Sequence, residues 1–237
     1  MFEKNYELRY SDTDFCGNVK KSAIIDLLQD ISIIHSNSVG LDKNKFAQGQ
    51  LACLLSGWRI CFKKPLVLYE TVTVKTGIMK ITGCEIYRRY EIWQNGQLKV
   101  AATGLWFTVN TETMRIARIG EDFFGAFGND FEYDNNLPCK RLSPVENAVF
   151  IGEAIVEKRD LDTNRHMNNV KSIDVFLSHM PDDFDFSEIQ VKYRKELKAG
   201  DNFKIYANME KGGFEIRNST QDICVLIYVK NQSENNV

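Results

Sequence analysis

The spacing of hydrophobic residues predicts one long helix near the start of the chain. Positions 23, 24, 27, 28, 31 and 34 are apolar and recur at helical intervals. Asn18 precedes this pattern as a candidate N-cap, and Gly40 follows it as a terminator. A strand is predicted ahead of the helix at 2–10, and a short helix behind it at 42–48. Because apolar residues cover much of the circumference of the long helix, we expect it to be enclosed.

Four β-rich runs follow these helices. They are LACLLSGWRICFKK at 51–64, ETVTVKTGIMKI at 70–81, CEIYRRYEIW at 84–93 and LKVAATGLWFTV at 98–109. The alternation of polar and apolar residues in the second run is typical of a strand with one buried face. The sequence NGQ at 95–97 predicts a hairpin turn between the last two runs.

The same order of elements returns in the second half. The sequence predicts a strand at 149–158, a polar loop, a helix at 170–180 and then four strand-like runs, EIQVKYRKEL, NFKIYANM, GFEIRN and DICVLIYVK. Between Gly120 and Asn147 the pattern gives way to Gly, Asn and Pro. We therefore place a first domain at 1–125, a linker at 126–147 and a second domain at 148–237.

Short stretches of identical or similar residues support a tandem duplication. Three segments of the first half match three of the second in the same order: 12–14 with 162–164, 18–20 with 169–171, and 60–66 with 191–197. On this alignment the polar residues of the second half meet different residues in the first: Cys16 stands at His166, Asp14 at Asn164 and Pro65 at Glu196. We expect the second copy alone to keep an active site.

Composition and charge exclude several classes of protein. Hydrophobic residues make up 43% and charged residues 26% of the chain, which excludes a disordered, collagen-like or coiled-coil protein. A net charge of -2 argues against nucleic-acid binding. No apolar run is long enough to span a membrane, and the charged start MFEKNYELRY is unlike a signal peptide, so we expect a cytoplasmic protein.

The six cysteines form no C-x-x-C pair and no cluster with histidine, so the sequence predicts neither a zinc site nor a redox motif. We expect free thiols that act as small buried hydrophobic residues.

The polar loop RDLDTNRHMNN is the candidate site. Asp162, Asn164, His166, Asn168 and Asn169 precede an apolar run, where Asx residues commonly form turns and helix N-caps. Glu196 beside Lys195 is by itself consistent with an exposed ion pair. Because the first copy builds the same elements with other residues, folding alone does not require this set, which favours a catalytic role.

The order strand, polar loop, long helix and four antiparallel strands is that of a hotdog fold, an α+β fold in which the sheet wraps around a central helix. We expect two hotdog domains in tandem. The loop D-x-N-x-H-x-N-N and VKYRKEL with Glu196 resemble the second half of acyl-ACP thioesterases, where ACP is acyl carrier protein. CEIYRRYEIW and LKVAATGLWFTVNTETMRIARI resemble the first half, so the resemblance extends from about residue 4 to 230.

The resemblance implies hydrolysis of fatty acyl-ACP to free fatty acid, with no metal or organic cofactor and with the acyl chain in the first half. Plant members of the family carry a cysteine directly after the glutamate, where this chain has Leu197. A thiolate at that position therefore cannot be the nucleophile here. An acyl-CoA thioesterase on the same scaffold, and a protein that binds acyl chains without turnover, remain as alternatives.

The chemistry of a thioester suggests a role for each residue. The leaving thiol has a pKa of about 8.5, so the reaction needs an activated water and an oxyanion site more than a general acid. We expect Glu196 to be the general base, with direct attack by its carboxylate as the variant. His166 would hold the water or the thioester oxygen, Asn164 would fix Glu196 or the water, and Asp162 would orient the loop and His166. Backbone amides near Asn168 and Asn169, at a helix N-terminus, would bind the oxyanion.

Basic residues surround the candidate base. The cluster consists of Lys192, Arg194, Lys195 and Lys198. It is either a solvated strand edge or a docking site for the acidic carrier protein or its phosphopantetheine phosphate. Because the internal pair of domains replaces the usual dimer of single hotdogs, we expect a monomer or a homodimer.

Overall fold

A computed structural model describes residues 1–113, 115–118, 125, 127 and 137–230. The chain divides into two compact units, unit 1 from Met1 to Cys139 and unit 2 from Lys140 to Val237. This division falls inside the expected linker at 126–147. Linker residues 126 and 128–136 lie outside the described residues.

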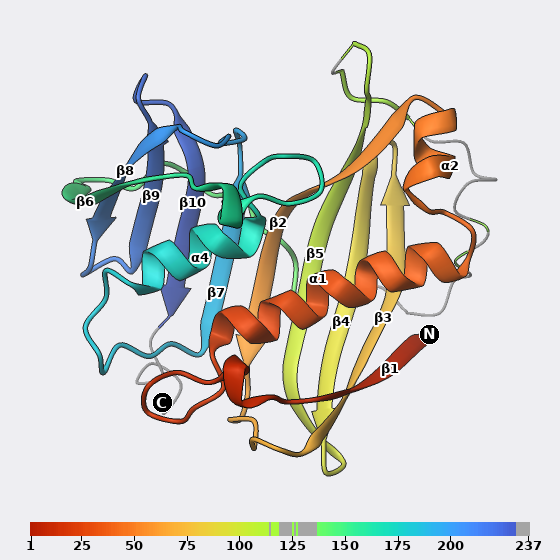
Figure 1. The fold of residues 1–237 in the computed structure, drawn as a ribbon, viewed down its shortest axis with the longest axis horizontal. Helices are drawn as coiled ribbons and strands as arrows, with labels where there is room; N and C mark the ends of the chain where they lie inside the picture. Colours follow the sequence, from red (N-terminus) through yellow and green to blue (C-terminus); the bar gives the residue numbers. More distant parts are fainter. Residues whose placement is uncertain (114, 119–124, 126, 128–136, 231–237) are drawn as a thin grey trace. The chain divides into compact units, whose positions relative to one another are not determined.

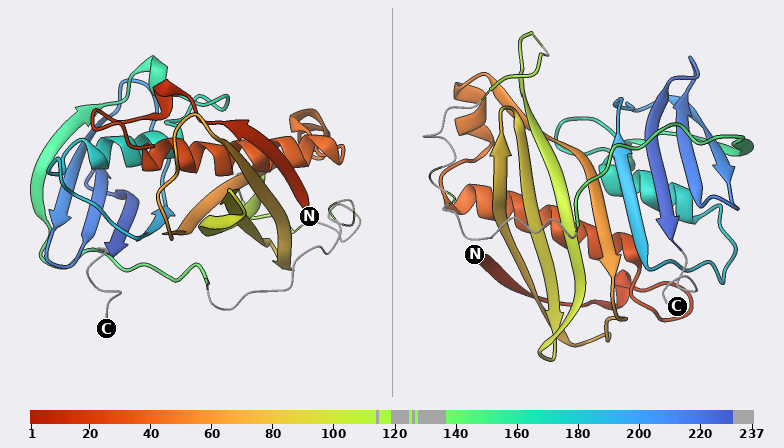
Figure 2. Two further views of the ribbon diagram at one scale, coloured as in Figure 1. Left: turned by 90° about the horizontal axis from the view of Figure 1, so that it is seen from below. Right: turned by 180° about the vertical axis from the view of Figure 1, so that it is seen from behind.

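Unit 1 is an antiparallel sheet with a long helix across one face (Figure 1). The strands pair in the order β1-β3-β4-β5-β2. The elements are β1 (Phe2–Glu7), α1 (Lys21–Ser38), α2 (Lys43–Gln48), β2 (Leu51–Phe62), β3 (Thr71–Thr82), β4 (Glu85–Gln94) and β5 (Gln97–Asn110). In the left view of Figure 2 the strands β2 to β5 pass beneath α1.

The core of unit 1 lies between α1 and the sheet. Ile25, Leu28 and Ile31 of α1 are fully buried, and every second residue of β4 is buried as the strand alternates between its two faces. Two polar links cross this core. Ser32 Oγ lies 2.7 Å from the Tyr90 hydroxyl, and His35 Nδ1 lies 3.1 Å from Arg88 Nη1. Both links join α1 to β4, and they fix which face of the helix meets the sheet.

Unit 2 repeats the topology with shorter elements. The strands pair in the order β7-β10-β9-β8-β6, all antiparallel. The elements are β6 (Val149–Ile155), α4 (Asn169–Leu177), β7 (Glu188–Tyr193), β8 (Asn202–Asn208), β9 (Gly213–Asn218) and β10 (Ile223–Lys230). Phe176 of α4 is fully buried against the rings of Phe184, Phe186 and Phe214.

Several predicted boundaries need correction. The helix α1 begins at Lys21 with Lys20 as N-cap, not with Asn18, because the Asn18 main chain is paired with Asp14. The helix α4 ends at Leu177, three residues before the predicted end. The strand β7 ends at Tyr193, so Glu196 lies beyond the strand and not within it. The next two N–H groups converge on the carbonyl of Cys224, which ends the regular ladder there.

The helices of the described part of the chain include none that combines the length and hydropathy of a membrane span.

Candidate functional site

A tight loop in unit 2 holds His166 through the carboxylate of Asp162. Asp162 Oδ1 accepts the N–H of Asn164 at 2.7 Å and the N–H of His166 at 3.1 Å. The N–H of Asp162 donates back to the His166 carbonyl at 2.8 Å. Arg165 completes the turn in the left-handed region, with φ of 64°. The main chain of His166 is therefore fixed by one acidic side chain.

His166 contacts the candidate base directly. Its Nε2 lies 3.1 Å from Glu196 Oε2. Since an ionised carboxylate only accepts hydrogen bonds, Nε2 carries the hydrogen of this pair. The side chains of His166 and Glu196 are 25% and 41% exposed, so water reaches both. Beside the pair, the N–H of Met167 donates to the Leu197 carbonyl at 2.7 Å and ties the loop to the segment that carries Glu196.

The N-terminus of α4 lies next in sequence to this pair. Asn168 caps the helix, because its Oδ1 accepts the N–H of Val170 at 2.9 Å. The N–H of Asn168 itself donates to the Asp160 carbonyl at 2.8 Å and is not available to a substrate. The N–H of Asn169 has no acceptor among the described residues. Of the two expected oxyanion donors, only the Asn169 amide is therefore available.

Asn164 does not contact the base in this structure. Its side chain is exposed, and its Nδ2 lies 3.4 Å from Asp162 Oδ2. The partner of Glu196 is His166, whereas we expected Asn164 to fix either Glu196 or the water. This difference arises from the tertiary pairing of Met167 with Leu197, which no local pattern encodes.

The basic cluster is largely engaged within unit 2. Lys195 Nζ lies 2.7 Å from Asp222 Oδ2, and this pairing lowers the pKa of the Asp222 carboxyl. Arg194 donates to the Leu142 carbonyl at 3.0 Å, and Lys192 lies within β7 opposite Leu226. Lys198 is exposed, and its ammonium group has no partner in the part of the chain that the structure describes.

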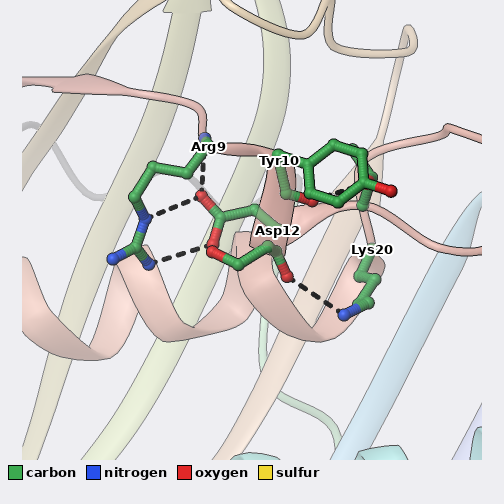
Figure 3. Close-up of polar contacts among 6 residues, drawn as sticks. Arg9, Tyr10, Asp12 and Lys20 are labelled. Atoms are coloured by element: carbon green, nitrogen blue, oxygen red, sulfur yellow. Dashed lines mark hydrogen bonds and ion pairs between the residues drawn. The ribbon is translucent and has the colours of Figure 1, made fainter.

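Unit 1 contains the same loop in a different register from the one that the sequence suggested. Asp14 Oδ1 accepts the N–H groups of Cys16 at 3.0 Å and of Asn18 at 2.8 Å, as Asp162 does with Asn164 and His166. The flanking turn repeats as well. Asp12 accepts the N–H of Arg9 (Figure 3). In the same way, Asp160 accepts the N–H of Glu157.

The equivalent residues of these loops are 148 positions apart, as the pairs 14 and 162, 16 and 164, and 18 and 166 show. His166 therefore corresponds to Asn18 and not to Cys16, and Asn164 corresponds to Cys16 and not to Asp14. The equivalence of Pro65 with Glu196 agrees with the structure. The N–H groups of Lys63 and Lys64 converge on one carbonyl, as those of Arg194 and Lys195 do. Unit 1 thus keeps the loop-forming aspartate without the histidine and glutamate.

All six cysteines are free thiols. The expectation that they are buried is wrong for Cys16, which is exposed, and only Cys224 is fully buried. Within the described ranges, no three His, Cys, Asp or Glu side chains are grouped closely enough to bind a metal ion.

Two family models match this chain. The model described as acyl-ACP thioesterase N-terminal domain matches residues 1–127, and the model described as acyl-ACP thioesterase C-terminal domain matches residues 146–236.

Curated relatives are distant in sequence. A dodecanoyl-[acyl-carrier-protein] hydrolase of Cinnamomum camphora is 22% identical in an alignment of length 218, gaps included, that covers 83% of this chain and 56% of that protein. Oleoyl-acyl carrier protein thioesterase 1 of Arabidopsis thaliana is 24% identical in an alignment of length 200 that covers 75% of this chain and 55% of the relative. The chain thus spans about half the length of the curated relatives that it matches.

Solved structures share the fold. A 12:0-ACP thioesterase from Umbellularia californica superposes with a TM-score of 0.85 at 18% identity, over 97% of this chain and 96% of that one. An acyl-ACP thioesterase from Bacteroides thetaiotaomicron gives 0.84 at 17% identity, over 97% and 96%. The expected α+β fold with two hotdog repeats is confirmed.

Proposed function

Because this chain belongs to the acyl-ACP thioesterase family, we propose that it hydrolyses fatty acyl thioesters of acyl carrier protein and releases free fatty acid. The observation that carries the proposal is the 3.1 Å contact between His166 Nε2 and Glu196 Oε2 beside the N-terminus of α4. It brings a general base, its positioning partner and an oxyanion donor into one short region of unit 2.

Glu196 acts as the general base. Its Oε2 accepts the hydrogen bond from His166, which leaves Oε1 to take a proton from water. The oxygen of that water attacks the thioester carbonyl carbon, and a tetrahedral oxyanion forms. The C–S bond then breaks, and the electron pair leaves with sulfur. Since the thiol has a pKa of about 8.5, the thiolate departs without a strong acid, and the proton on Glu196 returns to it or to solvent.

The N–H of Asn169 stabilises the oxyanion. It belongs to the first turn of a nine-residue helix, where the aligned peptide dipoles place partial positive charge. Loss of one such donor typically lowers the rate by about 100- to 1000-fold.

The acyl chain binds in unit 1. The sheet of unit 1 supports this assignment, because strands β2 to β5 have 10 to 14 residues whereas β7 to β10 have 6 to 8. A change in the chain-length profile of Trp58→Phe, whose ring is 1% exposed, tests this. Trp93→Phe is the control, because that half-buried ring on β4 is bonded to Glu91. An identical profile in both variants would count against an acyl site near Trp58.

The decisive experiment measures thiol release from acyl-ACPs and the matching acyl-CoAs. Wild type is compared with Glu196→Gln, which keeps the shape of the side chain and removes the base. Glu153→Gln is the matched control, an exposed glutamate of β6 with the same change in charge. We expect Glu196→Gln to lose about 100- to 10,000-fold in kcat and the control to match wild type.

Each other outcome has a definite meaning. Full activity in Glu196→Gln would exclude Glu196 as the base. Equal efficiency on acyl-CoA would make the protein a general acyl thioesterase. Retention of acyl chains without release of thiol from any substrate would identify a binding protein.

A further inference from the structure

Tyr193, the last residue of β7, links the strand that precedes Glu196 to the helix that carries the oxyanion donor. Its hydroxyl donates to the carbonyl of Asn169 at 3.1 Å. The same carbonyl accepts the hydroxyl of Ser172 at 2.6 Å. Glu196 follows Tyr193 by three residues in the chain. One side chain therefore connects the two parts of the site that must keep a fixed separation.

The peptide groups on both sides of Asn169 are held in place. On one side, the Asn168 carbonyl accepts the N–H of Lys171 at 2.9 Å. On the other, the Asn169 carbonyl takes the two hydroxyls, and the N–H of Val170 is held by the Asn168 side chain at 2.9 Å. The N–H of Asn169 lies between these anchors, so its direction depends on them.

Burial keeps the Tyr193 hydroxyl a donor. Burial raises the pKa of this phenol above its ordinary value, and the neighbouring Ser172 hydroxyl only partly offsets the effect. The hydroxyl therefore stays protonated throughout the range in which thioesters are assayed. The carbonyls of a first helical turn accept N–H groups of the same helix, so helix formation alone does not require the two hydroxyls at the Asn169 carbonyl.

We propose that Tyr193 is a positioning residue, which holds the Asn169 amide at the distance and direction from Glu196 that the oxyanion requires. This inference rests on the proposed function, because it assigns Asn169 to the oxyanion. Tyr193 touches neither the substrate nor the reacting atoms, and it acts through the main chain of Asn169. Its contribution is realised when the oxyanion forms, so it belongs to kcat rather than to substrate binding.

The test compares Tyr193→Phe with Tyr228→Phe. Tyr228 of β10 also donates its hydroxyl to a carbonyl of unit 2, that of Ser143 at 3.2 Å, but it has no link to α4. Both variants lose one hydroxyl-to-carbonyl bond and keep the ring. We expect Tyr193→Phe to lower kcat on acyl-ACP by about 10- to 100-fold with KM within twofold, and Tyr228→Phe to leave both unchanged. Ser172→Ala should reproduce part of the loss.

Amide exchange gives a second measurement that does not require turnover. In Tyr193→Phe the amide of Val170, which is bonded to the Asn168 side chain, should exchange about fivefold faster than in wild type, and in Tyr228→Phe it should not. A kcat within twofold of wild type, or equal losses in both variants, would overturn the proposal. If wild type hydrolysed no acyl-ACP, the proposed function would fail. In that case, unchanged amide exchange in Tyr193→Phe would show that Tyr193 does not hold the start of α4 either. Faster exchange would show that it does hold it.

Discussion

At the scale of single residues, the two copies of the loop differ in the residues that accompany a shared aspartate. Asp14 and Asp162 are both half-buried, and each accepts the backbone N–H groups of the residues two and four positions further along the chain. Only the loop of Asp162 carries a histidine at the second of these positions, and that histidine contacts a glutamate. The aspartate is therefore the part of the motif with which both copies form the loop, and we propose that the histidine serves the reaction.

The variants Asp162→Ala and Asp14→Ala test this separation. Each leaves two N–H groups without their acceptor, so both should lower the free energy of unfolding by a similar amount, about 1–3 kcal/mol. Asp162→Ala should in addition lower kcat by about 10- to 100-fold, because the His166 main chain moves. Urea unfolding and thiol release from acyl-ACP measure the two effects. An equal loss of activity in Asp14→Ala would show that the first loop also serves the reaction.

The thiols differ in their expected reactivity. Cys53 as a residue is half-buried, but desolvation of its thiol raises the pKa to about 12, with a smaller opposing effect of Arg88, whereas Cys16 is exposed. At pH 8 the thiolate fraction of Cys53 is about 10⁻⁴, which is too small for rapid alkylation. Iodoacetamide should therefore modify Cys16 within minutes and leave Cys53 unmodified until the protein unfolds, as peptide mass spectrometry would show. If the folded Cys16→Ser variant were still labelled rapidly, and the label lay on the peptide that contains Cys53, this assignment would be wrong.

At the scale of elements, hydrophobic periodicity predicted the helices and strands, but not their ends. The end of β7 depends on a carbonyl of β10, and the start of α1 depends on the carboxylate of Asp14. Such contacts join residues that are distant in sequence or belong to a side chain, so local spacing does not encode them. For this reason the sequence pattern predicts Glu196 within a strand and Asn18 as a cap, and the structure shows neither.

The helix α1 lacks a side-chain cap that α4 has. Lys20 and Asn168 occupy the N-cap with nearly identical backbone angles, φ -57° and ψ 136° against φ -56° and ψ 136°. Lys20→Asn should therefore let Oδ1 accept the N–H of Ser22, and raise the free energy of unfolding by about 0.5–1 kcal/mol. The contact of the exposed Lys20 ammonium with the Ser11 carbonyl is lost in exchange. Urea unfolding measures the gain, and Lys20→Ala is the control.

If Lys20→Ala raised the free energy of unfolding by the same amount, the effect would come from loss of the lysine and not from the new cap. No gain in Lys20→Asn would show that the amide does not reach the first turn.

At the scale of the whole molecule, the duplication was readable from the sequence, whereas the register of its loops was not. Letters that match, such as Asp-Thr at 12–13 and 162–163, suggested a shift of 150, but the hydrogen bonds set it at 148. The aspartate that organises each loop is followed by different residues in the two copies. An alignment by residue identity therefore gives the wrong register, although the hydrogen bonds of the two loops are equivalent. The structure brings together Asp162, His166 and Glu196, which the sequence proposes as members of one site. The contact of His166 with Glu196 could not be predicted, because it depends on a tertiary bond between Met167 and Leu197.

The charge around the site predicts how the protein meets an acidic carrier. Arg194 and Lys195 are engaged with Leu142 and Asp222, so Lys198 is the cation that is best placed to meet a partner. His166 and Lys198 pair through their main chains, which puts this lysine beside the site. Lys198→Glu should therefore lower kcat/KM on acyl-ACP about 10-fold at low salt, mainly through KM, with a smaller effect at high salt.

Lys64→Glu is the matched control, because this exposed lysine of unit 1 corresponds to Lys195 and the change in net charge is the same. It should leave kcat/KM within twofold of wild type. Since an exposed charge acts over about 10 Å at 0.1 M salt, a general effect of net charge would appear in both variants, and a docking effect only in Lys198→Glu. Free acyl-CoA makes the second comparison. If Lys198→Glu weakened its turnover as much as that of acyl-ACP, the lysine would contact the phosphopantetheine arm that both substrates share, and not the protein surface of the carrier.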